Sequence, residues 1–451
     1  MKTNTKGLTE GNIKTQLIIL ALPLLLGDIL QQFYNTVDAV IIGRFVGEAA
    51  FAAVGISGTL MNLFIFIISG CCIGMSVLFA RFYGEGDRGK FRQEFFIALS
   101  CGGLFTIFIS ILGILLLPVI LRLMSTPYET FSHARSYLMV IFSGLIATYL
   151  YNMLSAVLRA VGNTKATLYF LFAGIVSNIF LDLLFVAVFE MGMHGAALAT
   201  VMSQLISAAL CFIYIRSTSP ELIFTREDMR FDLGLLKATF NYGSISALQQ
   251  SSLHIGKILV QSCVNGLGLN AISAYTATTR IEGYVNSLGV SGTQAESIFV
   301  AQNYGAGKYD RVRKAARTGN LMYIILGFVL LPCMVFFAKP MILLMIPGAV
   351  PDTIREGCSY LIWLAPFYIF DYIGCIMSGY FRGIGKMDWA FYLTFGQVSL
   401  RVIFSYILVS SMQLAGVALA TGIGWTFAVI FVTINYKRSK KYLHPSAGQK
   451  S

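Results

Sequence analysis

The feature that most constrains the fold is a repeat that relates the first half of the chain to the second. RFYGEGDRGKFR (81–92) matches QNYGAGKYDRVR (302–313), and GAALAT (195–200) matches GVALAT (416–421). Matched stretches are separated by 218 to 223 residues, so one register relates the two halves from end to end. Two copies of one structural unit are therefore expected. Further matches are LRAVG (158–162) with FRGIG (381–385), SYL (136–138) with 359–361, and LQQ (30–32) with 248–250.

Composition places this repeat in a membrane. Hydrophobic residues make up 56% of the 451 residues and charged residues only 12%, against about 45–50% and about 25% in soluble domains. The seventh and eighth windows are too polar to be predicted from hydropathy alone, but the repeat aligns them with the first two and predicts helices there. The fold class is therefore all-α integral membrane, with twelve transmembrane helices. The windows are 14–43, 51–80, 94–120, 130–157, 167–189, 194–216, 234–265, 270–302, 316–345, 352–381, 388–411 and 413–436.

Each half holds six windows, an even number, so both halves start on the same side of the membrane and form a parallel repeat. The predicted organisation is an N-terminal six-helix lobe (1–216), a cytoplasmic linker (217–232), a C-terminal six-helix lobe (233–436) and a basic cytoplasmic tail (437–451). In each lobe a glycine, Gly84 or Gly305, is expected to serve the turn after the second helix.

Charge gives the orientation and excludes several functions. The net charge is +12, and Lys and Arg gather at the termini and in the even-numbered connections, which predicts a multi-pass protein of the cell membrane with both termini cytoplasmic. No basic domain stands apart from the apolar windows, so nucleic acid is not an expected partner. The sequence has no GxxxxGK[ST] or HExxH pattern and no Cys-x-x-Cys pair. We therefore expect neither an enzyme nor a cofactor.

Carboxylates inside the apolar windows need an explanation. Asp38 follows Pro23 by fifteen residues in the first window, and a charge at the bilayer centre costs roughly 2.5–3.5 kcal/mol on insertion scales. Proline permits a helix to bend, so Pro23 is a candidate hinge. In the fifth window Asn178 and Asp182 are four residues apart and share one helix face. Such groups mark ion or substrate paths, or they only join helices.

Several stretches together resemble the multidrug and toxic-compound extrusion (MATE) family of cation-coupled antiporters. They are ALPLLLGDILQQFYNTVDAVIIGRFVG in the first window, FARFYGEGDRGKFR after the second, LRAVGNTKAT after the fourth, SNIFLDLLFV in the fifth, MHGAALAT into the sixth and FRGIGKMDW after the tenth. The resemblance covers nearly the whole chain. It implies two six-helix lobes around a central cavity, in which a proton or sodium ion enters while an organic, often cationic, compound leaves.

Through this resemblance Asp38, Asn178, Asp182 and Thr200 match the family's coupling-ion positions in the N-terminal lobe. Two carboxylates and two neutral oxygens suit Na⁺, and close carboxylates could instead share a proton. The repeat supplies a control, since Asp38 aligns with Gly256 and Asp182 falls near 403–405. The second half lacks both carboxylates, so a six-helix lobe does not need them in order to fold.

Other polar residues are candidates for the substrate cavity. In the C-terminal lobe Asp371 precedes Arg382 by eleven residues, a spacing found in the branch of the family with an acidic C-lobe site. The basic Lys257 and Arg280 depart from that branch. Salt bridges of Arg280 or Arg401 with Asp371, Glu282 or Glu296 are the alternative to substrate contact. The candidates are Gln31, Tyr34, Asn35, Asn62, Arg280, Glu282 and Asp371.

The predicted function is multidrug efflux: a monomeric secondary antiporter exports small organic, cationic compounds in exchange for H⁺ or Na⁺ by alternating access. Loading Asp38 and Asp182 from outside would bend the first helix and release the substrate. The alternative is a lipid or lipid-linked glycan flippase of a related superfamily branch. Lys257, Arg280 and Arg401 keep that alternative open, because it requires a cavity ringed by basic residues.

Overall fold

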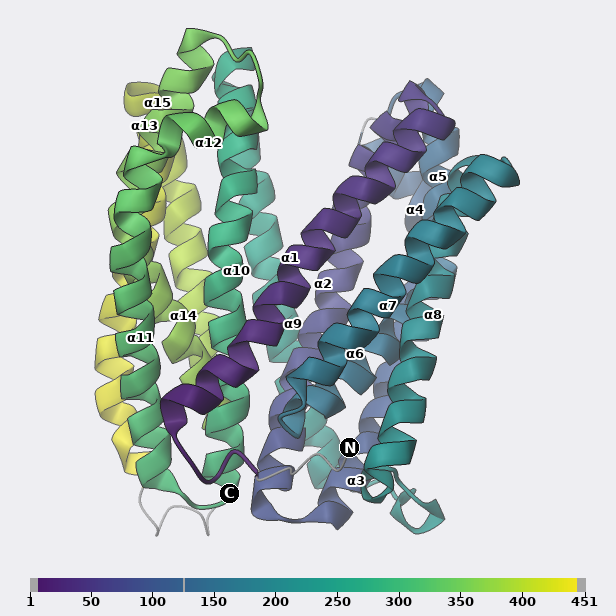
Figure 1. The fold of residues 1–451 in the computed structure, drawn as a ribbon, viewed down its shortest axis with the longest axis vertical. Coiled ribbons are helices and arrows are strands. Elements are labelled where there is room, and N and C mark those ends of the chain that lie inside the picture. Colours follow the sequence, from purple (N-terminus) through teal and green to yellow (C-terminus); the bar gives the residue numbers. More distant parts are fainter. Residues whose placement is uncertain (1–6, 125, 444–451) are drawn as a thin grey trace. The chain divides into compact units, whose positions relative to one another are not determined.

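A computed structural model describes residues 7–124 and 126–443, which are almost entirely helical and include no β-strand (Figure 1). The first half contains α1 (Ile13–Phe45), α2 (Glu48–Glu85), α3 (Arg88–Ile97), the π-helix η1 (Ala98–Gly102), α4 (Gly103–Leu123), α5 (Tyr128–Ser143), α6 (Leu145–Ala160), α7 (Thr164–Asp182), the π-helix η2 (Leu183–Val188) and α8 (Gly192–Thr218). Two 3₁₀ turns, η3 (Pro220–Leu222) and η4 (Arg226–Asp228), follow. The second half contains α9 (Leu233–Asn265), α10 (Leu269–Gly305), α11 (Tyr309–Phe336), α12 (Ala338–Met345), α13 (Pro351–Leu364), η5 (Ala365–Phe367), α14 (Tyr368–Gly383), α15 (Met387–Ser439) and η6 (Lys440–Leu443).

The helices confirm an all-α membrane fold. Among the described residues, eight helices are long and apolar enough to span a bilayer, or nine if the bent pair of α5 and α6 counts as one span. The repeat-based prediction of helices in the seventh and eighth windows is also confirmed, by α9 and α10, which are 33 and 37 residues long. The backbone of α15 breaks at Gln413, where φ is 52° and ψ is −131°. Twelve crossings remain a prediction.

The turns after the second helix of each half differ from the prediction. Gly84 lies inside α2, and Gly305 is the last residue of α10. The residues with positive φ are Gly86 (76°) and Gly307 (68°), two positions later in each copy. A left-handed backbone after a helix favours glycine because it has no Cβ. The repeat therefore preserved the turn, and the prediction chose the wrong glycine of each motif.

The chain forms two compact units that divide inside helices. The first unit comprises residues 22–247, and the second comprises 1–21 together with 248–451. Consequently α1 begins in the second unit and continues in the first, and α9 begins in the first and continues in the second. In the first unit α2 and α9 approach closely, since a Cβ on Gly74 would stand 2.1 Å from the carbonyl oxygen of Tyr242. Glycine is required there because any side chain would collide with backbone.

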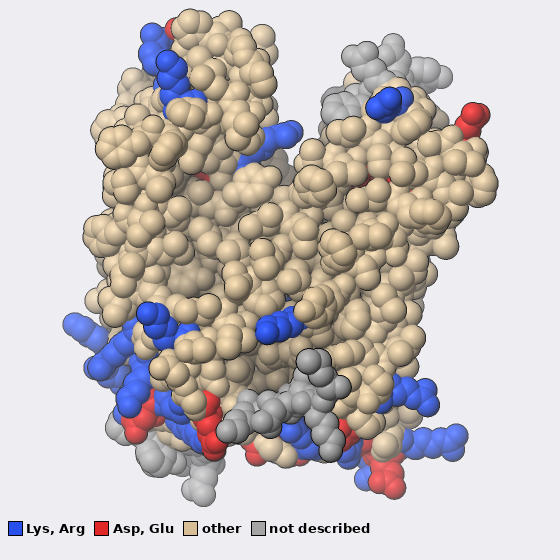
Figure 2. Space-filling model, in the orientation of Figure 1, with Lys and Arg blue, Asp and Glu red and all other residues tan. Residues whose placement is uncertain are grey.

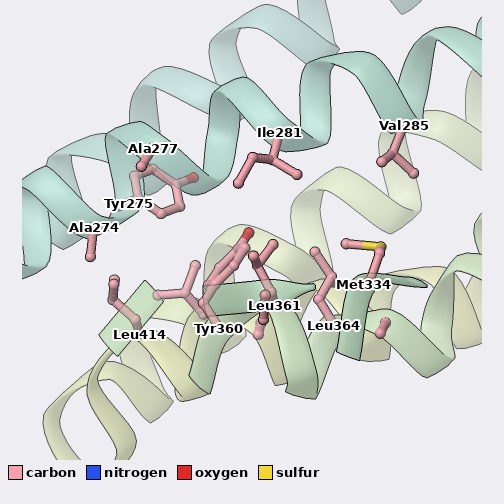
Figure 3. Packing of buried hydrophobic residues seen from close by; sticks show 14 of the residues in the cluster. Ala274, Tyr275, Ala277, Ile281, Val285, Met334, Tyr360, Leu361, Leu364 and Leu414 are labelled. Carbon is pink, nitrogen blue, oxygen red and sulfur yellow. The ribbon is translucent and has the colours of Figure 1, made fainter. Parts of the chain in front are cut away.

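The second unit has a continuous core between α10, α13, α14 and α15. Its buried members include Tyr275 and Ile281 of α10, Tyr360 and Leu364 of α13, and Leu414 of α15 (Figure 3). Tyr368 of α14 belongs to the same core. Tyrosine is frequent in this core, and a buried phenol needs a hydrogen-bond partner. Tyr360 and Tyr372 have one each, Glu282 and the Val285 carbonyl respectively.

The segment before α1 is fastened within the second unit. Leu8 donates its backbone N–H to Gln302 Oε1 at 3.2 Å and accepts from the side chain of Asn303 at 3.2 Å. Arg311 donates to the carbonyl oxygens of Leu8 at 3.1 Å and Gly11 at 2.9 Å. The end of α10 and the first turn of α11 therefore hold the segment that contains Leu8 and Gly11.

One arginine of the repeated motif has the same task in both units. Arg92 donates from Nε to Asp228 Oδ2 at 2.8 Å, in the segment that follows α8. Its repeat partner Arg313 donates to the carbonyl oxygen of Leu443 at 2.9 Å, in the segment that follows α15. Each arginine thus holds, by a hydrogen bond, the segment that follows the last helix of its own half.

Charged side chains are unevenly distributed. In each unit the Lys, Arg, Asp and Glu visible in Figure 2 gather mainly at one end, and the remaining visible surface is almost uncharged. Large apolar side chains of α4 such as Leu104, Phe108 and Leu115 are exposed, at 62% or more of their surface. Such an apolar surface is favourable in contact with lipid tails, because exposing it to water would be energetically unfavourable.

Candidate functional site

Three helices of the first unit supply the predicted ion-site residues. Asp38 lies in α1, Asn178 and Asp182 lie in α7, and Thr200 lies in α8. Asp182 is the last residue of α7, where the helix changes to the π-helix η2. Short π-helical segments widen the helix turn and are common at functional sites. Here the change begins at the carboxylate itself.

Asn178 connects the carboxylate to α8. With its amide oriented to satisfy both neighbours, Asn178 donates to Asp182 Oδ2 at 2.8 Å and accepts from the backbone N–H of Thr200 at 3.2 Å. The Thr200 hydroxyl is 3.5 Å from the hydroxyl of Tyr34. The carboxyl groups of Asp38 and Asp182 are within hydrogen-bonding reach of each other. The structure therefore brings the four predicted residues and Tyr34 together.

The two carboxyl groups are deeply buried and incompletely satisfied. Asp38 is 8% exposed and Asp182 is 0% exposed. Among the described residues, Oδ1 of each has no hydrogen-bond partner. Two bare anions at this spacing in a low-dielectric interior are costly. A shared proton or a bound Na⁺ removes that cost, so the arrangement is suited to taking up a small cation.

Sequence reasoning missed Tyr137, in α5. It is 2% exposed, and its hydroxyl is near Thr200, Asp38 and Asp182 and 3.8 Å from the Met61 sulfur. The signal that could have found it is the repeated SYL tripeptide, because the matching tyrosine, Tyr360, donates to Glu282 in the second unit. In both units this tyrosine accompanies a buried carboxylate.

Asp28 was also overlooked. It lies in α1, between Pro23 and Asp38, and its Oδ2 is buried without a hydrogen-bond partner among the described residues. Arg159, at the end of α6, is its cationic neighbour. The first helix therefore carries two carboxylates.

The remaining N-lobe candidates are not part of this cluster. Gln31, Asn35 and Asn62 are exposed, which is compatible with a surface open to substrate. Pro23 is buried, and α1 continues through it without interruption. The hinge role of Pro23 remains a prediction.

In the second unit the predicted residues separate into paired and unpaired groups. Glu282 is 5% exposed, accepts from the Tyr360 hydroxyl and lies 4.0 Å from the guanidinium of Arg401. Asp371 is 8% exposed, and Cys375 Sγ is 3.9 Å from it. Arg280 is exposed, and no ion pair to it is found in residues 7–124 or 126–443. Of the salt bridges that the sequence allowed, the structure contains the one between Arg401 and Glu282.

Comparison with known proteins identifies the family. The MatE family model matches residues 23–184 and again residues 246–407, which together exceed half of the chain. The chain belongs to the MATE family. The two matches also place the family's unit in each half, as the internal repeat predicted.

Individual MATE relatives agree over almost the full length. "Probable multidrug resistance protein YpnP" of Bacillus subtilis is 28% identical over 437 residues, covering 95% of this chain and 96% of the relative. "Probable multidrug resistance protein NorM" of Thermotoga maritima is 25% identical, covering 93% and 90%. A MATE transporter in an outward-facing conformation superposes with a TM-score of 0.89 at 23% identity, covering 97% and 98%. A MATE structure in a bent conformation gives 0.89 at 21% identity, covering 99% and 100%. These two structures support the fold.

Proposed function

We propose that this MATE protein is an antiporter that exports small organic cations in exchange for H⁺ or Na⁺. The observation that carries the proposal is the buried pair of Asp38 and Asp182, each with an unpartnered oxygen, beside Asn178, Thr200 and Tyr34. The names of the relatives, multidrug resistance proteins, favour organic compounds as the exported substrate. The proposal includes the coupling ion and no cofactor.

The mechanism that fits this arrangement is alternating access. When the coupling cation enters, it neutralises Asp38 and Asp182 and removes the repulsion between them. Because Asp38 and Pro23 lie on the same helix, a change in how Asp38 contacts α7 acts on α1, which can bend at Pro23. The organic cation then loses its attraction to the acidic site and leaves outward. The coupling ion and the substrate are thus exchanged at one place.

Proteoliposomes loaded with ethidium test this proposal. Efflux is measured with an imposed pH gradient, with an imposed Na⁺ gradient and with neither. We expect one of the gradients to accelerate efflux and the Asp38→Asn, Asp182→Asn double variant to lose that acceleration at equal incorporation. Equal efflux with and without both gradients would show that transport is not coupled to either ion.

The flippase alternative is less well supported. It needs several basic side chains available to a pyrophosphate. Lys257 and Arg280 are exposed, but Arg401 is paired with Glu282, and the names of the relatives favour multidrug efflux. Transport of ethidium by the purified protein, without any added lipid-linked glycan, would separate the two functions.

A further inference from the structure

The second unit carries a cation where the first unit carries Asp38. In the repeat Asp38 aligns with Gly256, and the next residue is Lys257. Lys257 lies in the half of α9 that belongs to the second unit, and its side chain is exposed. A lysine in this part of a membrane protein is costly unless it reaches water or a partner. Its surroundings therefore indicate what it is for.

Lys257 lies on a different face of α9 from two strongly exposed apolar residues. Ile255 and Leu259, two residues to either side, are 49% and 42% exposed. At about 100° per residue, they lie on the opposite side of α9 from Lys257. The polar residues Gln250, His254 and Gln261, at spacings of seven, three and four residues, share the face of Lys257. Val260 and Val264, at spacings of three and seven, are fully buried. Lys257 therefore lies between a buried apolar row and a polar stripe, on a different face from Ile255 and Leu259.

A second cation stands beside Lys257. The helices α9 and α15 pack closely, since a Cβ on Gly256 would lie 2.3 Å from Val398 Cγ1, and Tyr406 donates to the Leu259 carbonyl at 3.3 Å. Arg401, three residues after Val398, is a cationic neighbour of Lys257, and Glu282 is its acidic neighbour. Two positive charges thus adjoin across the contact between α9 and α15.

The acidic neighbour does not neutralise both cations. Glu282 accepts a hydrogen bond from the Tyr360 hydroxyl and pairs with Arg401. The Nε of Arg401 is buried and has no hydrogen-bond partner among the described residues. No ion pair to Lys257 is present in the described parts of the chain. The exposed ammonium of Lys257, supported by Arg401, therefore remains available to an anion.

We propose that Lys257 binds a carboxylate of the transported compound, so that the substrates include organic cations that also bear a carboxylate. The inference rests on the proposed efflux function and specifies its substrate class. An ammonium on a flexible stem can follow a carboxylate as the substrate moves. A substrate with only a positive charge would gain nothing from this group.

A pair of dyes that differ only in the carboxylate provides the test. Rhodamine B has a cationic ring system and a free carboxylate, whereas its ethyl ester keeps the cation and lacks the anion. Transport of both is measured in proteoliposomes for the wild type and for Lys257→Gln, Lys257→Arg and Lys237→Gln. Lys237 is an exposed lysine of the same helix in the other unit, and it serves as the matched control.

We expect Lys257→Gln to raise KM for rhodamine B about tenfold, a change of about 1.4 kcal/mol, with KM for the ester changed less than about twofold. Lys257→Arg should restore most of the rhodamine B transport, and Lys237→Gln should affect neither dye. Dye binding to purified protein, followed by fluorescence anisotropy, should give the same ratios for a variant that transports poorly.

Equal losses for both dyes, or no loss for either, would overturn the inference and leave the proposed function intact. If the wild type transports neither dye and binds neither, the proposed function fails, and the inference fails with it.

Discussion

The two units share one arrangement of helices but carry opposite charges at equivalent places. The first helix of the first unit buries a carboxylate, whereas the equivalent helix of the second unit exposes an ammonium group. In the first unit α1 contributes Asp38 to a buried acidic pair, and a tyrosine from α5 lies beside it. In the second unit the equivalent stretch of α9 contributes Lys257, and the matching tyrosine donates to Glu282. The scaffold is therefore duplicated, while the chemistry at equivalent places has diverged.

A second difference concerns the arginine near the end of the fourth predicted helix of each half, which is buried in the second unit (Arg382) and half-buried in the first (Arg159). Arg382 donates twice to Gln249 Oε1, at 3.2 and 2.7 Å, and Gln249 in turn donates to Thr394 Oγ1 at 2.6 Å and to the Ala390 carbonyl at 3.0 Å. Arg159, its repeat partner, has the carboxylate Asp28 as neighbour instead. One unit thus surrounds its arginine with uncharged hydrogen-bond partners, where the other places a carboxylate beside it. A carboxylate can take up a proton, whereas the amide of Gln249 cannot.

The largest effect should come from the acidic pair. We expect Asp38→Asn or Asp182→Asn to reduce gradient-driven ethidium efflux about a hundredfold, or about 2.7 kcal/mol, because a neutral amide cannot exchange a cation. Asp371→Asn, which removes an equally buried carboxylate of the second unit, should reduce it less than about threefold. Initial rates in proteoliposomes at matched incorporation give the comparison. If Asp371→Asn is as damaging as Asp182→Asn, the coupling function is not confined to the first unit.

The next largest effect is the loss of stability expected when Arg382 or its repeat partner Arg159 is replaced. Arg382→Gln should destabilise the protein by about 2 kcal/mol, because charge-assisted hydrogen bonds to Gln249 are lost inside the unit. Arg159→Gln should cost less than about 1 kcal/mol, since Asp28 can become neutral by binding a proton. Thermal unfolding in detergent, followed by the helical circular dichroism signal of the whole chain, measures both. A larger loss for Arg159→Gln would mean that the Asp28–Arg159 pair is the stronger of the two.

Much of the fold could be predicted from the sequence, because the repeat aligns polar segments, whose hydropathy alone does not predict a membrane helix, with apolar segments, whose hydropathy does. The polar helices α9 and α10 were predicted in this way, although neither passes a test of length and apolarity. Asn178 and Asp182 could be placed on one face because helical periodicity is local. Which other helix faces them depends on tertiary packing, so the contribution of Tyr137 was missed.

The same reason explains the rest of what the sequence left open. The charges of the second half allowed several salt bridges, and only coordinates distinguish Arg401–Glu282 from the others. The division of the units inside α1 and α9, at 21/22 and 247/248, has no compositional signal either. It follows from which helices the two ends of α1 and α9 pack against.

A smaller effect is expected at the edge of the acidic site. Tyr34→Phe removes one hydroxyl at 3.5 Å from Thr200, a long contact that contributes little. We expect a change of about threefold in ethidium efflux, or about 0.7 kcal/mol. Tyr137→Phe should cost more, because Tyr137 is nearly inaccessible to solvent and adjoins both carboxylates. Equal effects of the two substitutions would contradict the expectation that the more deeply buried hydroxyl of Tyr137 contributes more to transport.

The smallest effect concerns the two contacts that Arg92 and Arg313 make with the segments after α8 and α15, called the arginine clamps below. We expect the two clamps to respond differently to pH. Burial raises the pKa of Asp228, but hydrogen bonds from Arg92 and Thr225 outweigh it and hold the pKa below 3.8. The stability from this contact is therefore fully present above the pKa of the unfolded chain and is lost as the pH falls through the lowered folded value. Asp228→Asn should weaken the clamp by about 0.5 kcal/mol at pH 7, seen as faster hydrogen exchange in 220–232, and the difference should vanish in acid. The exposed Glu227→Gln is the control.

The clamp of the second unit provides the contrast. Arg313 donates to a carbonyl oxygen, so hydrogen exchange near Leu443, corrected for intrinsic rates, should not change with pH. A parallel loss of protection at both clamps in acid would instead indicate general unfolding.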